Sequence, residues 1–406
     1  MARLRPDSSF SASPDMATEA PKAPTGVQQR GRRSGDNIKE RFMKPTIKTV
    51  CGGSALLVVL SLTLAACQGE DGALSPESAE DADTPMVAAP AAAAAVKFGE
   101  PQQWSSFFCL KGEVCLIADV NADGKADAVA FNHGLNEANA VFLGLSNGAA
   151  FAPATKAHNF FCTKTQTCAV GDVNGDFKAD LIAFTRGTTP RVFVALSNGT
   201  SFGAPQQWSS SFCQNGDVCK VANVNGDVFA DLVAFKHRPF GTTNGVFVAL
   251  SNGSSFGQSQ RWTTGFCFST ETCEVGDVDG NGSVDILAFT RDPSRDVYVG
   301  LSKNTKFDPP ALWYSNSCQT GLVCLVADVN DDRRRDVVLF FHGLFGNFVY
   351  VQLSNGVAFA TPTLAHEFFC TKTQTCAVGD VNGDRKADVI AFTRETTPRI
   401  FVGLSQ

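Results

Sequence analysis

The chain has 406 residues, with 34 Lys and Arg residues against 40 Asp and Glu residues and a formal net charge of −6 at pH 7. The part from Cys67 onward is more acidic, because 24 basic residues face 35 acidic ones there, a net charge of −11. No basic face is visible in the sequence, so this composition argues against nucleic acid as a partner.

The first 96 residues are interpreted as a leader, an export signal and a tether. Residues 1–42 are polar, rich in Arg and patternless, so we expect a mis-assigned start or a disordered extension. Residues 43–66 are predicted to be a signal peptide, because the apolar run 55–66 is too short to span a bilayer. Residues 67–96 are acidic and then rich in Ala and Pro, which predicts a disordered tether.

The end of the apolar run predicts a lipid anchor. Leu64, Ala65 and Ala66 precede Cys67, and this small-residue pattern resembles a bacterial lipobox, in which the cysteine is lipidated. We therefore predict lipidation of Cys67. The alternative is an ordinary secretory signal that is cleaved nearby.

Residues 97–406 contain six copies of one unit: two cysteines six positions apart and, four residues later, a run of Asp and Asn. The unit recurs every 51 to 54 residues, measured at Asp119, Asp172, Asn223, Asp277, Asp328 and Asp380. A period of this length without a helical pattern is typical of a radial or stacked β array.

Each unit reads as a meander of short strands. In the second copy, the apolar runs 180–184 and 191–197 are separated by turn residues, and Asn198-Gly199 follows them. Several runs are apolar on both faces, so both faces should be covered, as in stacked propeller blades. Residues 97–104 supply the piece that the sixth unit lacks, which predicts closure by an N-terminal strand. We predict an all-β fold, a β-propeller of six blades with four antiparallel strands each, with an open or differently closed array as the alternative.

The cysteines divide without remainder. Of fourteen, Cys51 lies in the signal and Cys67 at the lipobox, and the other twelve form six Cys-x5-Cys pairs. Even pairing in an exported chain favours disulfides, and zinc is the alternative, although Cys-x5-Cys is not a usual zinc pattern. The predicted disulfide cysteines are Cys109, Cys115, Cys162, Cys168, Cys213, Cys219, Cys267, Cys273, Cys318, Cys324, Cys370 and Cys376.

The acidic run of each unit places oxygen side chains at loop positions one, three, five and nine. Hard cations prefer six to eight oxygen ligands, and a loop that alternates ligands with spacers can wrap one ion. We predict up to six Ca²⁺ ions, with Asx turns that need no ion as the alternative. The candidate ligands are Asp119, Asn121, Asp123, Asp127, Asp172, Asn174, Asp176, Asp180, Asn223, Asn225, Asp227, Asp231, Asp277, Asp279, Asn281, Asp285, Asp328, Asn330, Asp332, Asp336, Asp380, Asn382, Asp384 and Asp388.

These loops, each followed by a strand, resemble the FG-GAP or VCBS repeats of integrin α-like propellers and bacterial surface proteins. Phe202-Gly203-Ala204-Pro205 preserves part of the motif that names the family, and the resemblance covers residues 97–406. It implies a β-propeller with one mainly structural calcium in each blade. The third loop begins with Asn223 instead of Asp, and the fifth contains three arginines at 333–335, so we predict the weakest binding in these two.

Two further sets of residues are candidates for ligand recognition. Trp104, Trp208, Trp262 and Trp313 lie five residues before a first cysteine, where His158 and His366 stand nearby in the other two units. Exposed tryptophans would stack on a sugar, whereas buried ones would pack against the neighbouring blade. A second position alternates strictly between His and Arg and would form either a cationic rim or pairs with loop carboxylates: His133, Arg186, His237, Arg291, His342 and Arg394.

The sequence therefore predicts a calcium-stabilised propeller that acts as a lectin-like or adhesion module in the bacterial cell envelope, lipid-anchored at the outer membrane or cell surface. The expected partners are a glycan or a surface protein, with the membrane contacted through the anchor alone. A structural scaffold without sugar binding is the second hypothesis. A polysaccharide hydrolase or lyase is the third, and we do not expect an enzyme because no nucleophile, phosphate-loop or zinc-protease motif is present.

Overall fold

We describe a computed structural model of the chain for residues 95–133, 139–237, 244–268, 270–343 and 346–406. The predicted leader, signal peptide and lipidated Cys67, and the tether up to residue 94, lie outside the described residues. Within the described ranges, all assigned secondary-structure elements are β-strands. No helix there is long and apolar enough to cross a bilayer.

The strands form six antiparallel sheets of four, which are the blades. The first blade comprises β2 (Val114–Ala118), β3 (Asp127–Phe131), β4 (Val141–Gly144) and β5 (Thr155–His158). The second comprises β6 (Thr167–Gly171), β7 (Asp180–Phe184), β8 (Val192–Ala195) and β9 (Gln206–Ser209). The third comprises β10 (Val218–Ala222), β11 (Asp231–Lys236), β12 (Gly245–Ala249) and β13 (Gln260–Thr264).

The other three blades repeat this order. The fourth comprises β14 (Thr272–Gly276), β15 (Asp285–Phe289), β16 (Val297–Gly300) and β17 (Ala311–Tyr314). The fifth comprises β18 (Val323–Ala327), β19 (Asp336–Gly343), β20 (Gly346–Gln352) and β21 (Thr363–His366). The sixth comprises β22 (Thr375–Gly379), β23 (Asp388–Phe392), β24 (Ile400–Gly403) and β1 (Gln102–Ser105).

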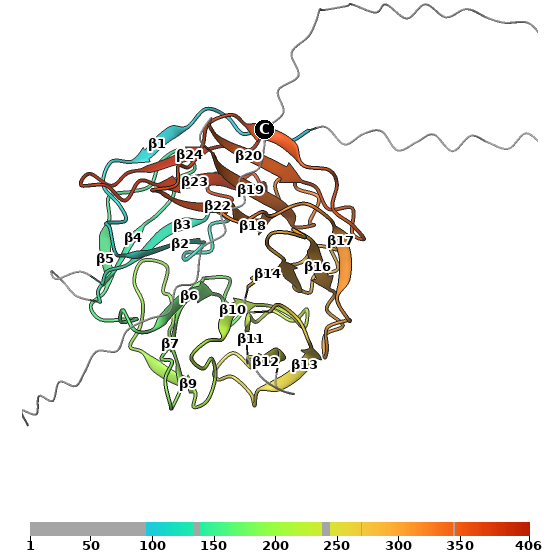
Figure 1. Cartoon of the computed structure of the whole chain (residues 1–406). Coiled ribbons are helices and arrows are strands. Elements are labelled where there is room, and N and C mark those ends of the chain that lie inside the picture. Colours follow the sequence, from blue (N-terminus) through green and yellow to red (C-terminus); the bar gives the residue numbers. More distant parts are fainter. Residues whose placement is uncertain (1–94, 134–138, 238–243, 269, 344–345) are drawn as a thin grey trace, which may run out of the picture. The chain divides into compact units, whose positions relative to one another are not determined.

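The sixth blade closes the ring by combining both ends of the propeller sequence. Strand β1 pairs antiparallel with β24, with Gln102 opposite Val402 and Gln103 opposite Phe401. The innermost strands β2, β6, β10, β14, β18 and β22 contact one another in a closed cycle around the centre (Figure 1). This arrangement confirms the predicted six-bladed propeller and its closure by an N-terminal strand.

The core lies between blades and within them. The second strand of every blade is buried along the five residues that begin with its Asp, because neighbouring blades cover both faces. Phe131, Phe184 and Phe235, at the end of these runs, are completely buried. Stacked blades thus explain why the strands are apolar on both faces rather than alternating.

The strand directions give the propeller two faces. The acidic loops join the first and second strands of each blade, and the Leu-Ser turns after the third strands lie at the same end; we call this the acidic face. The disulfides lie at the opposite end, where the fourth strand of one blade leads to the first strand of the next; we call this the disulfide face.

Candidate functional site

Five of the six acidic loops share one geometry, in which side-chain oxygens accept hydrogen bonds from the loop backbone, including one from the amide at position six. In the first loop, Asp119 Oδ1 accepts from the Asn121 amide N at 3.2 Å, and Oδ2 accepts from the Gly124 amide N at 2.9 Å. Asn121 Oδ1 accepts from the Asp123 amide N at 3.0 Å. These bonds curl the chain around the oxygens at positions one, three and five, as a Ca²⁺ loop requires. They are also Asx-type bonds, so they maintain the loop shape by themselves.

The aspartate at position nine has a second role, which sequence reasoning missed. Asp180 has no exposed surface; its Oδ2 accepts from the Val173 amide N at 3.2 Å and its Oδ1 from the Ser197 amide N at 2.8 Å. Ser197 Oγ donates to the Val120 carbonyl of the preceding blade at 2.6 Å. The same connection occurs at all six blade boundaries, and the recurring Ser of the Leu-Ser turn was its signal in the sequence.

The backbone reinforces this connection. The amide N at position eight of each loop donates to the carbonyl at position one of the preceding loop, for example Ala179 to Asp119 at 2.8 Å. The acidic loops are therefore linked in sequence around the ring. A change in one loop acts directly on a blade boundary.

Burial makes the position-nine carboxyls hard to ionise. Loss of hydration raises their pKa to about 7, while the two backbone hydrogen bonds lower it, and neighbouring carboxylates in all six loops raise it further. The six groups are Asp127, Asp180, Asp231, Asp285, Asp336 and Asp388. A bound divalent cation would favour their charged form, so these loops suit a cation electrostatically.

Three loops contain an internal cation that competes for the position-five carboxylate. Lys125 Nζ lies 3.0 Å from Asp123, and Lys178 Nζ lies 3.0 Å from Asp176. Burial raises the pKa of both aspartates, but several interactions lower it, the strongest of them the hydrogen bond from the lysine, so that on balance the pKa is lowered. In the fifth loop the guanidinium of Arg334 lies 2.6 Å from Asp332. The arginines of the fifth loop were the basis for predicting weak binding there, whereas the lysines at position seven of the first two loops were not anticipated from the sequence.

The fourth loop brings acidic oxygens closest together. Oxygens of Asp277, Asp279 and Asp285 all lie within 4.8 Å of one another, the only all-carboxylate group of this kind in the described residues. Ser283 occupies position seven, so no basic side chain from that position competes. The residues therefore fit a hard divalent cation best in this loop.

The third loop departs from the common geometry. Phe177, Arg333 and Arg385 all adopt positive φ at position six, near 65°, 68° and 71°, but the β-branched Val228 is not among the positive-φ residues. Asn223 Oδ1 accepts from the Gly226 amide N at 2.9 Å. A turn that differs from the other loops is consistent with weak cation binding by the third loop, and the weak binding itself stays a prediction.

Six disulfides are present, each within one Cys-x5-Cys pair, and they indicate an oxidising, extracellular or exported environment. The fold places His133, His237 and His342, which are distant in sequence, beside the disulfide of the following blade. His133 Nε2 lies 2.8 Å from the Cys162 carbonyl O. Both sulfurs are in disulfide bonds, so these groups are not zinc sites in this state.

The alternating arginines also contact the next blade, rather than forming a cationic rim or pairing with loop carboxylates. Arg186 Nη1 donates to the carbonyls of Gln214 and Asp217 at 2.7 and 2.8 Å. Arg394 Nη2 donates to the Glu113 carbonyl at 2.6 Å. Sequence distance conceals these contacts, because the partners come from the following unit.

All four tryptophans are buried between blades. Their exposed fractions are 3 to 7 %, and each ring packs against a Phe of the next blade with centroids 5.2 to 5.6 Å apart. Trp208, for example, packs on Phe256 at 5.5 Å. No indole face is therefore free to stack on a sugar ring.

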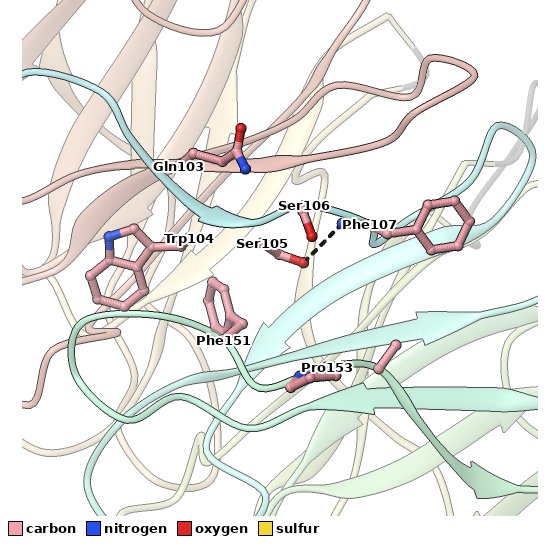
Figure 2. A pocket seen from close by; sticks show the side chains of 8 residues that line it. Gln103, Trp104, Ser105, Ser106, Phe107, Phe151 and Pro153 are labelled. Atoms are coloured by element: carbon pink, nitrogen blue, oxygen red, sulfur yellow. Dashed lines mark hydrogen bonds between the residues drawn. The ribbon is translucent and has the colours of Figure 1, made fainter.

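A pocket of about 490 Å³ opens beside Trp104. Figure 2 shows Ser105 and Ser106 between the Trp104–Phe151 pair and the side chain of Phe107, with Gln103 nearby. Strand β1 of the sixth blade supplies one wall, and the segment around Phe151 of the first blade supplies the other. The pocket therefore lies at a blade boundary.

An equivalent pocket of about 500 Å³ lies beside Trp208 and is lined by three consecutive serines, 209–211, and by Gln258 and Ser259. The buried Trp208 Nε1 and Ser259 Oγ have no hydrogen-bond partner within the described part of the chain. Buried polar atoms are rarely unpaired, so each such atom calls for an explanation, such as an ordered water, a bound ion or a functional role. Ser211 stands here where Phe107 stands in the first pocket.

No family model matches the chain, and no curated protein matches its sequence. The Tc holotoxin pore of Photorhabdus luminescens is similar in fold, with a TM-score of 0.53 and 14% identity over 76% of this chain and 14% of that chain. AofleA from Arthrobotrys oligospora has a TM-score of 0.47 and 7% identity, covering 77% of this chain and 88% of that one. The V. cholerae biofilm matrix protein Bap1 has a TM-score of 0.28 and 17% identity, covering 66% and 42%. At these identities, the likeness concerns the fold alone.

Proposed function

We propose that this chain is an exported, calcium-stabilised binding module of the bacterial cell envelope, related to the FG-GAP and VCBS repeats that its loops resemble. The signal sequence and the lipobox-like Cys67 support export and lipid anchoring. The clustered carboxylates of the acidic loops, and above all Asp277, Asp279 and Asp285, support Ca²⁺ as a structural ion.

We place glycan recognition in the pocket beside Trp208. The observation that carries this proposal is the pair of unpartnered buried groups, Trp208 Nε1 and Ser259 Oγ, in a pocket lined by further hydroxyl and amide groups. An indole N–H donates, and serine hydroxyls both donate and accept, so together they match the hydroxyl groups of a sugar. Binding would satisfy groups that are otherwise desolvated without compensation.

The test is glycan-array binding by the purified chain and by two pocket variants. Trp208→Phe removes the N–H and keeps a ring against Phe256, and Ser259→Ala removes the hydroxyl. We expect roughly tenfold weaker binding for each, since one hydrogen bond is lost in a dry site. Trp262→Phe is the matched control, because Trp262 packs on Phe307 in the same way but lies at another boundary.

The scaffold hypothesis makes the opposite prediction. A scaffold would bind no glycan on the array, while a pull-down from envelope extract with the calcium-loaded chain would retain protein partners. Turnover of a polysaccharide by the purified chain would instead support a hydrolase or lyase.

A further inference from the structure

The disulfide face carries three exposed phenylalanines at equivalent positions. Each stands two residues before a first cysteine, and the exposed fractions are 56, 59 and 60 % for Phe107, Phe160 and Phe368. The residue that follows each of them is a buried Phe of the core. The buried Phe packs in the core of this segment, whereas the exposed Phe before it does not take part in that packing.

The other three blade boundaries lack this exposed ring. Ser211, Gly265 and Asn316 occupy the same position there, and those blades have the same four-stranded sheets. The fold thus does not require the aromatic residue. Exposed apolar groups that serve no packing role are typical of an interaction surface when they gather on one side.

The three phenylalanines do gather on one side. Phe368, Phe107 and Phe160 stand in the segments that lead into the sixth, first and second blades, which are consecutive around the ring. The polar positions occupy the other three consecutive boundaries. The phenylalanines two residues before a first cysteine are thus confined to one half of the disulfide face, and among the described residues the other half has a single exposed ring, Phe268, at a different position directly after Cys267.

Lysines follow the same division. Lys111, Lys164 and Lys372 stand two residues after the first cysteine at the same three boundaries, and all three are exposed. The corresponding sequence positions elsewhere are Asn215, Ser269 and Thr320. Within the described residues, none of the three lysines is in an ion pair.

We call these six residues the Phe–Lys arc, and we propose that the arc docks on an anionic lipid surface. Aromatic rings beside exposed lysines are the combination that inserts at a lipid interface and pairs with its acidic headgroups. Glu367 and Glu395 are exposed acids near the arc, but the exposed Arg399 adds to the three lysines, so positive charge prevails. On the other half of the disulfide face, Asp292 is exposed and Glu271 is partly exposed.

The described chain enters the propeller on the acidic face, at the end opposite the arc, because Phe98 pairs with Ser405 of the last Leu-Ser turn. The Phe98 amide N donates to the Ala365 carbonyl of β21, and the Gln406 amide N donates to the Lys97 carbonyl, so the described chain enters between the fifth and sixth blades. Strand β21 continues directly to Phe368. The lipid contact would therefore be made by the side chains of the arc themselves and does not depend on where the chain enters.

The experiment measures partitioning of the exported chain onto vesicles, with Cys67→Ser in every sample so that no acyl chain contributes. Vesicles of phosphatidylglycerol mixed with phosphatidylcholine are compared with phosphatidylcholine alone. Replacing the three lysines by Gln should lower partitioning onto anionic vesicles on the order of 100-fold, and added salt should have a similar effect. Replacing the three phenylalanines by Ser should lower it roughly tenfold or more.

The matched control replaces three exposed apolar residues of the acidic face, Phe177, Val228 and Val357, by Ser. This control should partition like the parent chain, and near-UV circular dichroism should be unchanged in all variants. Equal binding to both vesicle types, or equal losses for arc and control variants, would overturn the proposal. Arc variants that change self-association but not vesicle binding would assign the arc to a second copy of the chain instead. None of these outcomes depends on the glycan pocket at Trp208, so the two proposals fail separately.

Discussion

Removal of divalent cations should reverse the usual pH dependence of stability in this propeller. The position-nine aspartates have a folded pKa of about 7, well above the 3.8 of an ordinary aspartate side chain. Between these values the folded state binds more protons than the unfolded state, so the free energy of unfolding must fall as pH rises. The stabilising contribution is fully present below about pH 4 and is lost as pH rises through about 7.

The size of the effect follows from the sixfold repetition. One pKa unit corresponds to about 1.4 kcal/mol, so a shift of even one unit in each of six carboxyls amounts to on the order of 8 kcal/mol. A typical domain has a total stability of about 5–15 kcal/mol, so a change of this size is large. Aspartates with a lowered pKa, such as Asp123 and Asp176, act in the opposite direction, but only at lower pH.

The assay is thermal melting of the purified chain in a chelator at pH 5.5 and at pH 8. We expect a Tm higher by at least several degrees at pH 5.5, and we expect millimolar Ca²⁺ to raise the Tm mainly at pH 8. Asp180→Asn is the internal check, because the variant should show a smaller slope. A Tm in chelator that is flat or that rises with pH would show that these carboxyls are not buried acids in the folded protein.

Three further outcomes are expected. Ser251→Ala should lower the free energy of unfolding by about 1–2 kcal/mol, because the Val173 carbonyl loses its 2.7 Å hydrogen bond, whereas Ser254→Ala at an exposed position should change denaturant midpoints little. Asp277→Asn should remove the tightest step in a calorimetric Ca²⁺ titration, and an unchanged first step would contradict the ranking of the loops. Trp313→Ala should cost about 3–5 kcal/mol in urea unfolding and Trp313→Phe clearly less, since the indole is 7 % exposed and packed on the next blade.

The blade number and the ring closure were predictable because both depend on local, repeated spacing. The Cys pairs, the acidic loops and the strand lengths recur with little slippage, and the N-terminal Lys97–Trp104 segment visibly completes the sixth copy. Disulfide pairing was predictable for the same reason, since each bridge joins residues six apart. The architecture could therefore be predicted from local repetition alone.

Contacts between blades were much less predictable. Ser197 and Val120 are 77 residues apart, and Arg186 and Gln214 belong to different units, so no spacing within one copy reveals these bonds. The pocket beside Trp208 was beyond sequence reasoning in another way. The pocket is distinguished by Trp208 Nε1 and Ser259 Oγ, which have no hydrogen-bond partner among the described residues. Only the packing of two blades against each other determines this, so it cannot be read from the sequence of one repeat.

Each blade boundary is held by two joints that respond to different chemistry. On the acidic face, Ser251 Oγ and the backbone join neighbouring loops around a buried carboxyl whose charge depends on protons or cations. On the disulfide face, His or Arg side chains such as Arg186 contact the covalently closed hairpin of the next blade. The joints lie at opposite ends of strands of four to eight residues, roughly 13–26 Å apart at about 3.3 Å per residue.

Perturbations at this separation without shared partners should add. We therefore expect chelation to lower the Tm in a pH-dependent way and disulfide reduction to lower it in a pH-independent way across pH 5.5–8. Applied together at pH 8, they should lower the free energy of unfolding by the sum of the separate losses, within about 0.5 kcal/mol. A combined loss far from that sum, measured by urea unfolding, would mean that the two faces are coupled through the blades, so that cation occupancy reaches the disulfide face and its Phe–Lys arc.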